Sequence, residues 1–391
     1  MKKVVIGLSG GVDSAVAAYL LSKEYEVIGV TLRMQGDCFA FREEEDAAGA
    51  AARIGIPHEI VDCTEAFTDV QRYFADAYLA GTTPNPCIFC NPTVKWKMLL
   101  DYADRVGAEY VATGHYAFVE QTESGRYTLR TADSDKDQTY ALCMLSQEQL
   151  ARTIMPLGRY SKEEVRAFAR EIGLEISDKP DSMEICFVRD NDYAGFIERY
   201  QEDRAVSAET EGDGTDCKSR STDADSSEMD SSEADGKNRP REGNFVDMEG
   251  HVLGRHKGFF HYTIGQRKGL GIAFGKPMFV KEIRPETNEV VLAGNEDLFV
   301  NEVAVKQFNR MGADDAFLAY ENTAAKCGEK VLLGKIRYSH KGEKCSIISA
   351  DADSLRIRFE NPVRAVTPGQ ALVLYDARGR VIGGGIIQKD R

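Results

Sequence analysis

The sequence has 391 residues, of which 42% are hydrophobic and 29% are charged, enough for two or three folded domains. No apolar stretch is long enough for a signal peptide or a membrane helix. The odd count of nine cysteines argues against a disulfide framework. We therefore expect a cytoplasmic protein that does not contact a membrane and keeps its cysteines reduced.

The net charge of -14 is unevenly distributed along the chain. Residues 201–242 include 13 acidic and 6 basic residues, so this segment carries half of the net charge. It is rich in Asp, Ser, Glu and Gly and poor in large apolar residues, which predicts a disordered linker or insertion. Basic clusters at 255–257 and 267–268 lie outside it, so an RNA partner is not excluded.

The first 200 residues alternate β-branched strands with amphipathic helices, which predicts an α/β domain built on a parallel sheet. Strands are expected at 4–8, 27–32, 59–61 and 110–113, and helices at 15–21, 43–54 and 67–79. A further helix is expected after Ser161, because Ser161 and Glu164 form a capping box and Gly173 marks the end. Ligands of such sheets bind beyond the carboxyl ends of the strands.

The sequence after residue 243 changes to short strands and frequent glycines. Residues 244–253 predict a hairpin about Glu249-Gly250, and 261–275 form a basic, glycine-rich stretch. Alternating strands are expected at 279–283, 289–292, 331–338, 354–359 and 371–374. We therefore expect a small central domain over 243–277 and a C-terminal β-barrel over 278–391, after a catalytic domain over 1–200.

The sequence SGGVDS at 9–14 follows an apolar strand and predicts a phosphate-binding loop. Gly10 and Gly11 allow backbone N–H groups to approach phosphate oxygens, and Ser9 and Ser14 add hydroxyl donors. The following helix favours anions at its N-terminus. Asp13 would hold the loop or position Mg²⁺. The loop lacks the features of a Walker A loop or a dinucleotide fingerprint, and the plain alternative is a glycine turn.

Cys87 and Cys90 lie in a proline-rich loop. Asn91 is expected to cap a helix that begins at Pro92, which would place Cys90 just outside a helix N-terminus. A helix N-terminus lowers a thiol pKa, so Cys90 is predicted to be reactive; the alternative is that both cysteines pack the helix start. Cys186 by itself could be a strand cysteine facing a core. The remaining cysteines are expected to be packing or surface residues: Cys38, Cys63, Cys143, Cys217, Cys327 and Cys345.

Several segments in the same order resemble the tRNA-specific 2-thiouridylase family of the PP-loop superfamily. They are SGGVDS at 9–14, TPNPCIFCN at 83–91, ATGHY at 112–116, KDQ at 136–138, the surroundings of Cys186, YTIGQRKGLGI at 262–272 and VTPGQ at 366–370. The resemblance covers nearly the whole chain apart from the acidic segment. It implies a PP-loop (adenine nucleotide alpha hydrolase-like) parallel-sheet domain, a small central domain and a C-terminal β-barrel.

The resemblance implies ATP-dependent 2-thiolation of the wobble uridine in tRNAs for Lys, Glu and Gln, a tRNA-uridine 2-sulfurtransferase reaction. ATP would adenylate the 2-carbonyl oxygen, and a persulfide sulfur would then displace AMP. Cys186 would carry the persulfide, received from a cysteine desulfurase or a sulfur-relay protein. Cys90 would be the nucleophile that forms a transient disulfide with Cys186.

The resemblance also implies binding residues. ATP contacts are implied for Gly7, Leu8, Ser9, Gly10, Gly11, Val12, Asp13, Ser14, Leu32 and Gly114. Contacts to the target base are implied for Asn85, Pro86 and Cys87, and further tRNA contacts for His115, Lys136, Asp137, Gln138, Arg337, Tyr338 and Gln370.

Cys87 departs from the family pattern, because much of the family has an aspartate there, a candidate for general acid-base assistance. Cys87 is therefore at most an assistant in catalysis. It also gives an alternative route, in which Cys87, Cys90 and Cys186 hold an iron-sulfur cluster with one iron open for a sulfide. The competing functions are a PP-loop enzyme that makes an amide or deazapurine, and a catalytically silent tRNA-binding protein.

Structural roles remain open for the other motifs. His115 could cap a strand, and Asp137 could cap a helix start. Arg337-Tyr338 is expected inside a strand, where alternation turns one of the two outward whatever the function. The turn at 265–269 could be a solvated basic turn or a phosphate contact.

Overall fold

The computed structural model describes residues 1–36, 38–174, 185–188, 191–211, 242–272, 275–313 and 331–389, with backbone only at 38–40 and 205–211. The chain folds into two compact units. The first unit comprises Met1–Ala77, Thr82–Met183 and Asn295–Arg391, and the second comprises Tyr78–Gly81 and Glu184–Gly294.

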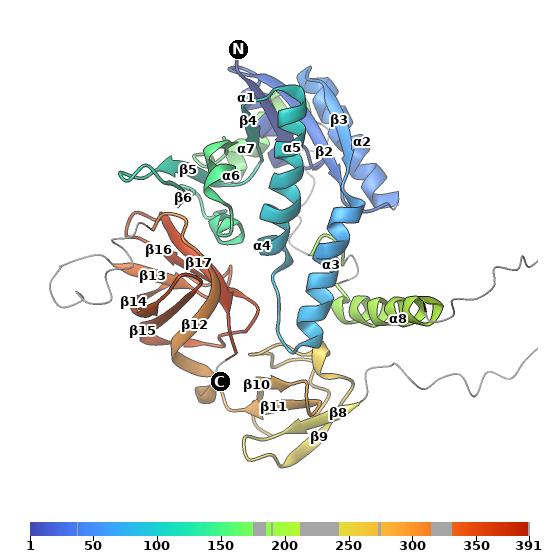
Figure 1. Ribbon diagram of the computed structural model, residues 1–391, viewed down its shortest axis with the longest axis vertical. Coiled ribbons are helices and arrows are strands. Elements are labelled where there is room, and N and C mark those ends of the chain that lie inside the picture. Colours follow the sequence, from blue (N-terminus) through green and yellow to red (C-terminus); the bar gives the residue numbers. More distant parts are fainter. Residues whose placement is uncertain are drawn as a thin grey trace, which may run out of the picture. The chain divides into compact units, whose positions relative to one another are not determined.

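A five-stranded parallel sheet forms the core of the N-terminal part of the first unit (Figure 1). Its strands are β1 (Lys3–Gly7), β2 (Glu26–Arg33), β3 (His58–Asp62), β4 (Tyr110–Ala112) and β7 (Thr153–Ile154), in the order β3-β2-β1-β4-β7. Every pairing in it is parallel, as predicted. The chain leaves β1 toward β2 on one side, whereas β4 lies on the other side. The gap between the carboxyl ends of β1 and β4 is therefore a topological switch point.

Helices cover both faces of this sheet. On one face lie α1 (Val12–Leu21), α2 (Cys38–Ile54) and α7 (Lys162–Glu171), and on the other lies α5 (Trp96–Val106). The other helices of the unit are α3 (Thr64–Leu79), α4 (Pro86–Cys90), a π-helical turn η1 (Asn91–Lys95), a 3-10 turn η2 (Thr139–Leu142) and α6 (Gln147–Ala151). Successive β1 residues face opposite sides: Val4 packs with α1, α2 and α7, and Val5 packs with α5. The predicted capping box of Ser161 and Glu164 is confirmed at the start of α7.

A closed six-stranded barrel completes the first unit, as predicted. Its strands are β12 (Phe299–Asn309), β13 (Leu332–Lys335), β14 (Glu343–Ala350), β15 (Ser354–Arg364), β16 (Ala371–Tyr375) and β17 (Val381–Ile387), preceded by η5 (Glu296–Leu298). Strand β16 is buried on both sides. Leu372 and Leu374 fill the barrel core, whereas Val373 and Tyr375 pack with the α/β core. A hairpin of β5 (Ala117–Gln121) and β6 (Tyr127–Thr131) also joins that core through Leu129.

The second unit contains α8 (Tyr193–Glu211) and a four-stranded sheet. Its strands are β8 (Gly243–Val246), β9 (Val252–His256), β10 (Phe279–Arg284) and β11 (Glu289–Ala293), in the order β10-β11-β8-β9, with η4 (Phe259–His261) after β9. The predicted hairpin about Glu249-Gly250 is confirmed. The strands predicted at 279–283 and 289–292 form and pair with each other, but β11 joins β8 and neither strand joins the barrel, because Val280 and Val290 share a core with Phe245.

Helix α8 continues to Glu211, so the first part of the segment predicted to be disordered is helical. The rest of that segment, residues 212–241, lies outside the described residues.

Within the described ranges, no helix combines the length and the apolar character that crossing a bilayer would require.

Candidate active site at the carboxyl edge of the sheet

The loop after β1 has the geometry that phosphate binding requires. Gly10 adopts a φ of 68°, and a Cβ there would lie 2.5 Å from the carbonyl oxygen of Glu43. The Ser14 hydroxyl accepts a hydrogen bond from the Ser9 N–H (3.1 Å) and donates one to the Gly11 carbonyl (3.0 Å). Gly11 caps α1 without a side chain, which leaves the N–H groups of the first turn open to an anion. These features are those of an anion-binding loop, and ATP as its ligand stays a prediction.

The neighbouring strand ends complete this edge. Leu8 donates its N–H to the Val30 carbonyl (2.8 Å) and accepts a hydrogen bond from the Thr31 hydroxyl (2.9 Å). These bonds fix the loop against β2, whose carboxyl end carries Leu32. A Cβ added to Gly7 would lie 3.4 Å from the Leu99 side chain of α5. Gly7 and Leu8 thus lead directly into the loop, and the place of Gly7, Leu8 and Leu32 in a nucleotide site stays a prediction.

The Asp13 carboxylate is already occupied by protein donors. The Lys162 ammonium lies 2.8 and 2.9 Å from its two oxygens, and the Tyr116 hydroxyl donates to Oδ1 at 2.7 Å. Of the two roles expected for Asp13, holding the loop fits these contacts, and positioning Mg²⁺ stays a prediction. Lys162 was missed in the sequence. The sequence feature that could have revealed it is its position: it lies in the first turn of α7, where a positive charge is unfavourable because it opposes the helix dipole.

Gly114 brings the end of β4 against the phosphate-binding loop. A Cβ on Gly114 would lie 2.6 Å from the Ser14 amide nitrogen and 2.8 Å from the Asp13 carbonyl carbon. No side chain can be accommodated at such distances. The prediction that Gly114 belongs to the nucleotide site therefore has a steric basis.

The helix after the proline-rich loop begins earlier than predicted. Asn85 is the N-cap and accepts a hydrogen bond from the Cys87 N–H (3.1 Å), and Pro86 is the first helical residue. The assignment of Asn91 as N-cap and Pro92 as helix start is wrong, because Asn85-Pro86 carries the same signal earlier in the chain. The missing N–H of Pro92 is accommodated by the π-helical turn between α4 and α5.

Cys90 consequently lies inside the helical run and is buried, with 7% of its surface exposed. The predicted lowering of its pKa by a helix N-terminus is wrong: burial raises the pKa of Cys90, and the Lys95 charge partly offsets the rise. Lys95 follows Cys90 by one π-helical turn and was not singled out in the sequence. Cys87 occupies the first turn of α4 and is exposed.

His115 follows Gly114, just after the end of β4. Its Nδ1 is 2.9 Å from the Thr113 hydroxyl, and its ring centroid is 5.7 Å from that of Trp96, the residue after Lys95. Burial, assisted by the Lys95 charge, lowers the pKa of His115 to about 3. The imidazole is therefore neutral at physiological pH, so any contact with tRNA would be a hydrogen bond or a stacking contact.

The barrel supports the loop that carries the predicted base contacts. Thr83 donates its N–H to the Pro368 carbonyl (2.8 Å), and the Gln370 side chain donates to the Thr83 carbonyl (2.9 Å). Gly369 has a φ of 92°, and its Cβ would lie 3.0 Å from the Thr83 backbone. Gln370, predicted to contact tRNA, thus anchors the segment leading to Asn85.

The Lys136-Asp137-Gln138 motif makes internal hydrogen bonds. Asp137 accepts hydrogen bonds from the N–H and hydroxyl of Thr139 (3.3 and 2.9 Å), but Gln138 is the N-cap of η2, so the prediction of Asp137 as the cap is wrong. The Gln138 side chain accepts the Tyr116 N–H at 3.0 Å, so it braces the segment after Gly114. These contacts support the structural role of both residues.

Arg337 and Tyr338 lie in a turn, because β13 ends at Lys335 and not at 338 as predicted. Arg337 donates a hydrogen bond to the Arg364 carbonyl (3.0 Å). Tyr338 is 48% exposed, and its ring meets Tyr140 edge to face at a centroid distance of 6.5 Å. An exposed aromatic ring suits an RNA contact, although the strand alternation argument no longer applies.

Cys186 belongs to the second unit, where the described stretch 185–188 forms a turn closed by the Val188 N–H and the Ile185 carbonyl (2.9 Å). Its side chain is exposed, whereas Phe187 is buried and packs on Phe196 at a ring-centroid distance of 5.1 Å. Since Cys186 and Cys90 fall in different units, their pairing remains a prediction.

The cysteines are all outside disulfides over the described part of the chain. Burial raises the pKa of Cys63 to about 11 and that of Cys143 and Cys345 to about 12. These three thiols are therefore inert at neutral pH, which agrees with their predicted packing role. Cys217 and Cys327, and the side chain of Cys38, lie outside the described residues.

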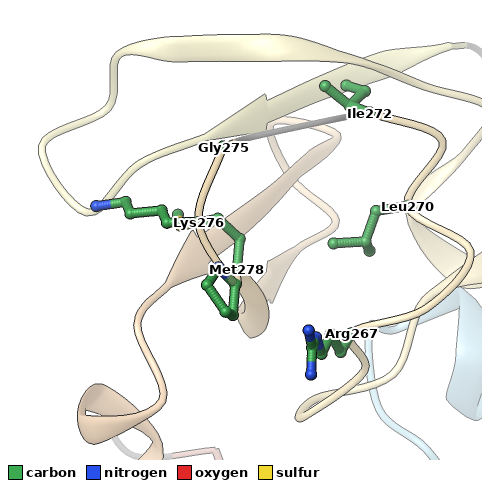
Figure 2. A pocket seen from close by; sticks show the side chains of 7 residues that line it. Arg267, Leu270, Ile272, Gly275, Lys276 and Met278 are labelled. Atoms are coloured by element: carbon green, nitrogen blue, oxygen red, sulfur yellow. The ribbon is translucent and has the colours of Figure 1, made fainter.

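A pocket of about 350 Å³ opens in the basic, glycine-rich stretch of the second unit. Figure 2 shows Leu270 pointing into it, with Arg267 at one side. The buried side chains of Leu270 and Met278 form apolar walls. The Gln266 side chain accepts the Thr263 N–H and donates to the Lys268 carbonyl, which fixes the turn that carries Arg267.

Comparisons with known proteins agree with this architecture. Three family models match in succession: the tRNA methyl transferase HUP domain over residues 2–190, the tRNA methyl transferase PRC-barrel domain over 236–294 and the aminomethyltransferase beta-barrel domain over 317–387. Among solved structures, the U34-tRNA thiolase NcsA from Methanococcus maripaludis with its [4Fe-4S] cluster is 22% identical and covers 56% of this chain and 74% of its own, with a TM-score of 0.31. That likeness is too small to support a functional argument.

Two curated relatives match along the whole chain. The tRNA-specific 2-thiouridylase MnmA of Lachnoclostridium phytofermentans is 45% identical over 403 residues, covering 100% of both chains. That of Clostridioides difficile is 44% identical over 401 residues, covering 99% of this chain and 98% of its own. The chain therefore belongs to the tRNA-specific 2-thiouridylase MnmA family.

Proposed function

We propose that the protein thiolates the wobble uridine of tRNAs for Lys, Glu and Gln at position 2, using ATP and a cysteine persulfide. The observation that carries the proposal is the arrangement at the end of β4. The Tyr116 hydroxyl donates a hydrogen bond to Asp13 of the phosphate-binding loop. The adjacent His115 packs against Trp96, which belongs to the same continuous helical run as Cys90. The segment after β4 thus contacts both the phosphate-binding loop and the helical run that carries Cys90.

The residues support an adenylation step. The N–H groups at the start of α1 and the Ser9 hydroxyl would bind phosphate oxygens as the uridine 2-oxygen attacks the α-phosphorus and pyrophosphate leaves. Oxygen is a poor leaving group as oxide and a good one as AMP, so this step prepares C2 for a sulfur nucleophile. Mg²⁺ would enter with the polyphosphate, while Asp13 holds the loop through Lys162 and Tyr116.

The sulfur step would use two thiols. The Cys90 thiolate would attack Sγ of the Cys186 persulfide, forming the Cys90–Cys186 disulfide and releasing the terminal sulfur as sulfide. Sulfide would add at C2 and expel AMP, and an external thiol would then reduce the disulfide. A cysteine desulfurase or relay protein would supply the sulfur at Cys186, which is exposed as such a transfer requires.

One observation favours the iron-sulfur alternative. Cys87 and Cys90 lie on one helical turn of α4, a spacing that lets two thiolates approach one metal centre. Anaerobic purification followed by iron and sulfide analysis separates the routes. Iron bound stoichiometrically and lost in Cys87→Ser would contradict the persulfide route.

The experiment that tests the function is a thiolation assay. The purified protein is incubated with ATP, cysteine, a desulfurase and unmodified tRNA, and thiolated tRNA is separated on a mercury gel. We expect a retarded band that requires ATP and is lost in Cys90→Ser and Cys186→Ser but retained in Cys345→Ala, which removes a buried barrel thiol. No retarded band with a donor that serves another thiouridylase would contradict the proposal.

A further inference from the structure

The Asp13–Lys162 pair is a largely enclosed ion pair at the phosphate-binding loop. The Lys162 side chain is 8% exposed and that of Asp13 is 32% exposed. Both carboxylate oxygens contact the one ammonium group, and the buried Tyr116 adds its hydroxyl to Oδ1. Lysine is rarely buried to this extent without a functional or structural reason.

Asp13 presents an electrostatic problem for ATP binding. It lies in the first turn of α1, between Gly11 and Ser14, where the loop would contact phosphate oxygens. An uncompensated carboxylate there would repel a polyphosphate at close range. The ammonium of Lys162, held from the start of α7, contacts both carboxylate oxygens and so offsets this charge.

We propose that Lys162 is a positioning residue for ATP: by pairing with Asp13 it makes the phosphate-binding loop electrically neutral and fixes its shape. The alternative is that Lys162 leaves Asp13 and bonds the phosphates itself. This inference rests on the proposed use of ATP and adds to it a residue that acts through Asp13.

A double-mutant comparison separates the two roles. The affinity for ATP with Mg²⁺ is measured by equilibrium dialysis for the full chain, without tRNA or sulfur donor. We expect Lys162→Met to weaken ATP binding at least about 10-fold, because the bared carboxylate faces the phosphates. In the Asp13→Asn background, we expect the same substitution to change affinity by less than about 3-fold. An equal loss in both backgrounds would show that Lys162 binds phosphate directly and would overturn the proposal.

A second variant guards against misfolding. Tyr116→Phe removes only the hydroxyl that bonds to Asp13, and we expect it to weaken ATP binding about 2- to 5-fold in the wild-type background and not in Asp13→Asn. Thermal melting checks that each variant is folded, and an unaltered affinity in a folded Tyr116→Phe protein would also contradict the proposal. Dialysis reports on ATP alone, so a protein that binds ATP but thiolates no tRNA would sink the proposed function and leave this test intact.

Discussion

Gly114 and Ser14 lie so close that a single added methyl group cannot fit between them: a Cβ on Gly114 would be 2.6 Å from the Ser14 amide nitrogen. Both residues meet through backbone atoms, so neither can rotate away. The end of β4 thereby sets the position of the phosphate-binding loop.

Gly114→Ala should therefore displace the loop and weaken ATP binding at least about 10-fold, a loss of about 1.4 kcal/mol or more. Equilibrium dialysis with ATP and Mg²⁺ measures the effect. Gly49→Ala is the matched control, since nothing lies within 4 Å of its added Cβ and it sits within α2. Equal affinities for the two variants would show that the contact does not control the loop.

Cys90 should react through a thiolate that Lys95 helps to form. Burial raises its pKa and the Lys95 charge lowers it, so Lys95→Met should raise the pKa further and slow iodoacetamide alkylation of Cys90 at about pH 7.5 by about 3- to 10-fold. Peptide mass spectrometry reports the rate for Cys90 alone. Lys95→Arg should keep most of the rate, and Lys97→Met, which removes an exposed lysine paired with Asp101, should leave it unchanged. A Lys95→Met protein alkylated as fast as the wild type would refute this role.

His115 should make the fold sensitive to acid. Its folded pKa is lowered to about 3, whereas the unfolded chain titrates near the ordinary value of 6.5. Below pH 6.5 the unfolded state binds a proton that the folded state refuses, so stability is present above that pH and falls as the pH drops toward 3. Urea unfolding of His115→Gln between about pH 7 and about pH 4.5 should show a shallower loss of stability than the wild type. Parallel curves for the two proteins would contradict the prediction.

Gln370→Ala should loosen the segment that leads to Cys87. It removes the hydrogen bond to the Thr83 carbonyl, worth about 1 kcal/mol, and should speed amide exchange over residues 82–89. Hydrogen exchange with mass spectrometry measures this. Gln388→Ala removes a bond within the barrel, from Nε2 to the Ile386 carbonyl (2.8 Å), and should not alter exchange in that segment. Unchanged exchange in Gln370→Ala would mean that Pro368 and Gly369 suffice to hold Thr83.

The sequence predicted those parts of the fold that depend on local pattern. The parallel strands, the Ser161 capping box and the phosphate-binding loop each follow from a short run of residues. The start of the Cys90 helix was misplaced because Asn85-Pro86 and Asn91-Pro92 are equivalent signals, and only packing selects the first. Strand β10 was assigned to the barrel because alternation does not reveal the partner of a strand.

The site contacts that escaped prediction join distant parts of the chain. Lys162 meets Asp13 across 149 residues, and Gln370 meets Thr83 across 287. Neither separation along the chain follows from the periodicity of a helix or a strand, so these two contacts could be identified only in the folded structure. Cys90 was selected for the wrong reason: it is buried, and its activating charge comes from Lys95 and not from a helix N-terminus.

The most direct test of sulfur transfer through Cys186 and Cys90 is a single-turnover chase of labelled sulfur. The protein is loaded with ³⁵S by a desulfurase, freed of donor and mixed with unmodified tRNA and ATP. We predict that label on Cys186 moves to tRNA in the wild type only when ATP is present, and that it stays on the protein in Cys90→Ser. Transfer to tRNA at the wild-type rate in Cys90→Ser, or without ATP, would contradict the account.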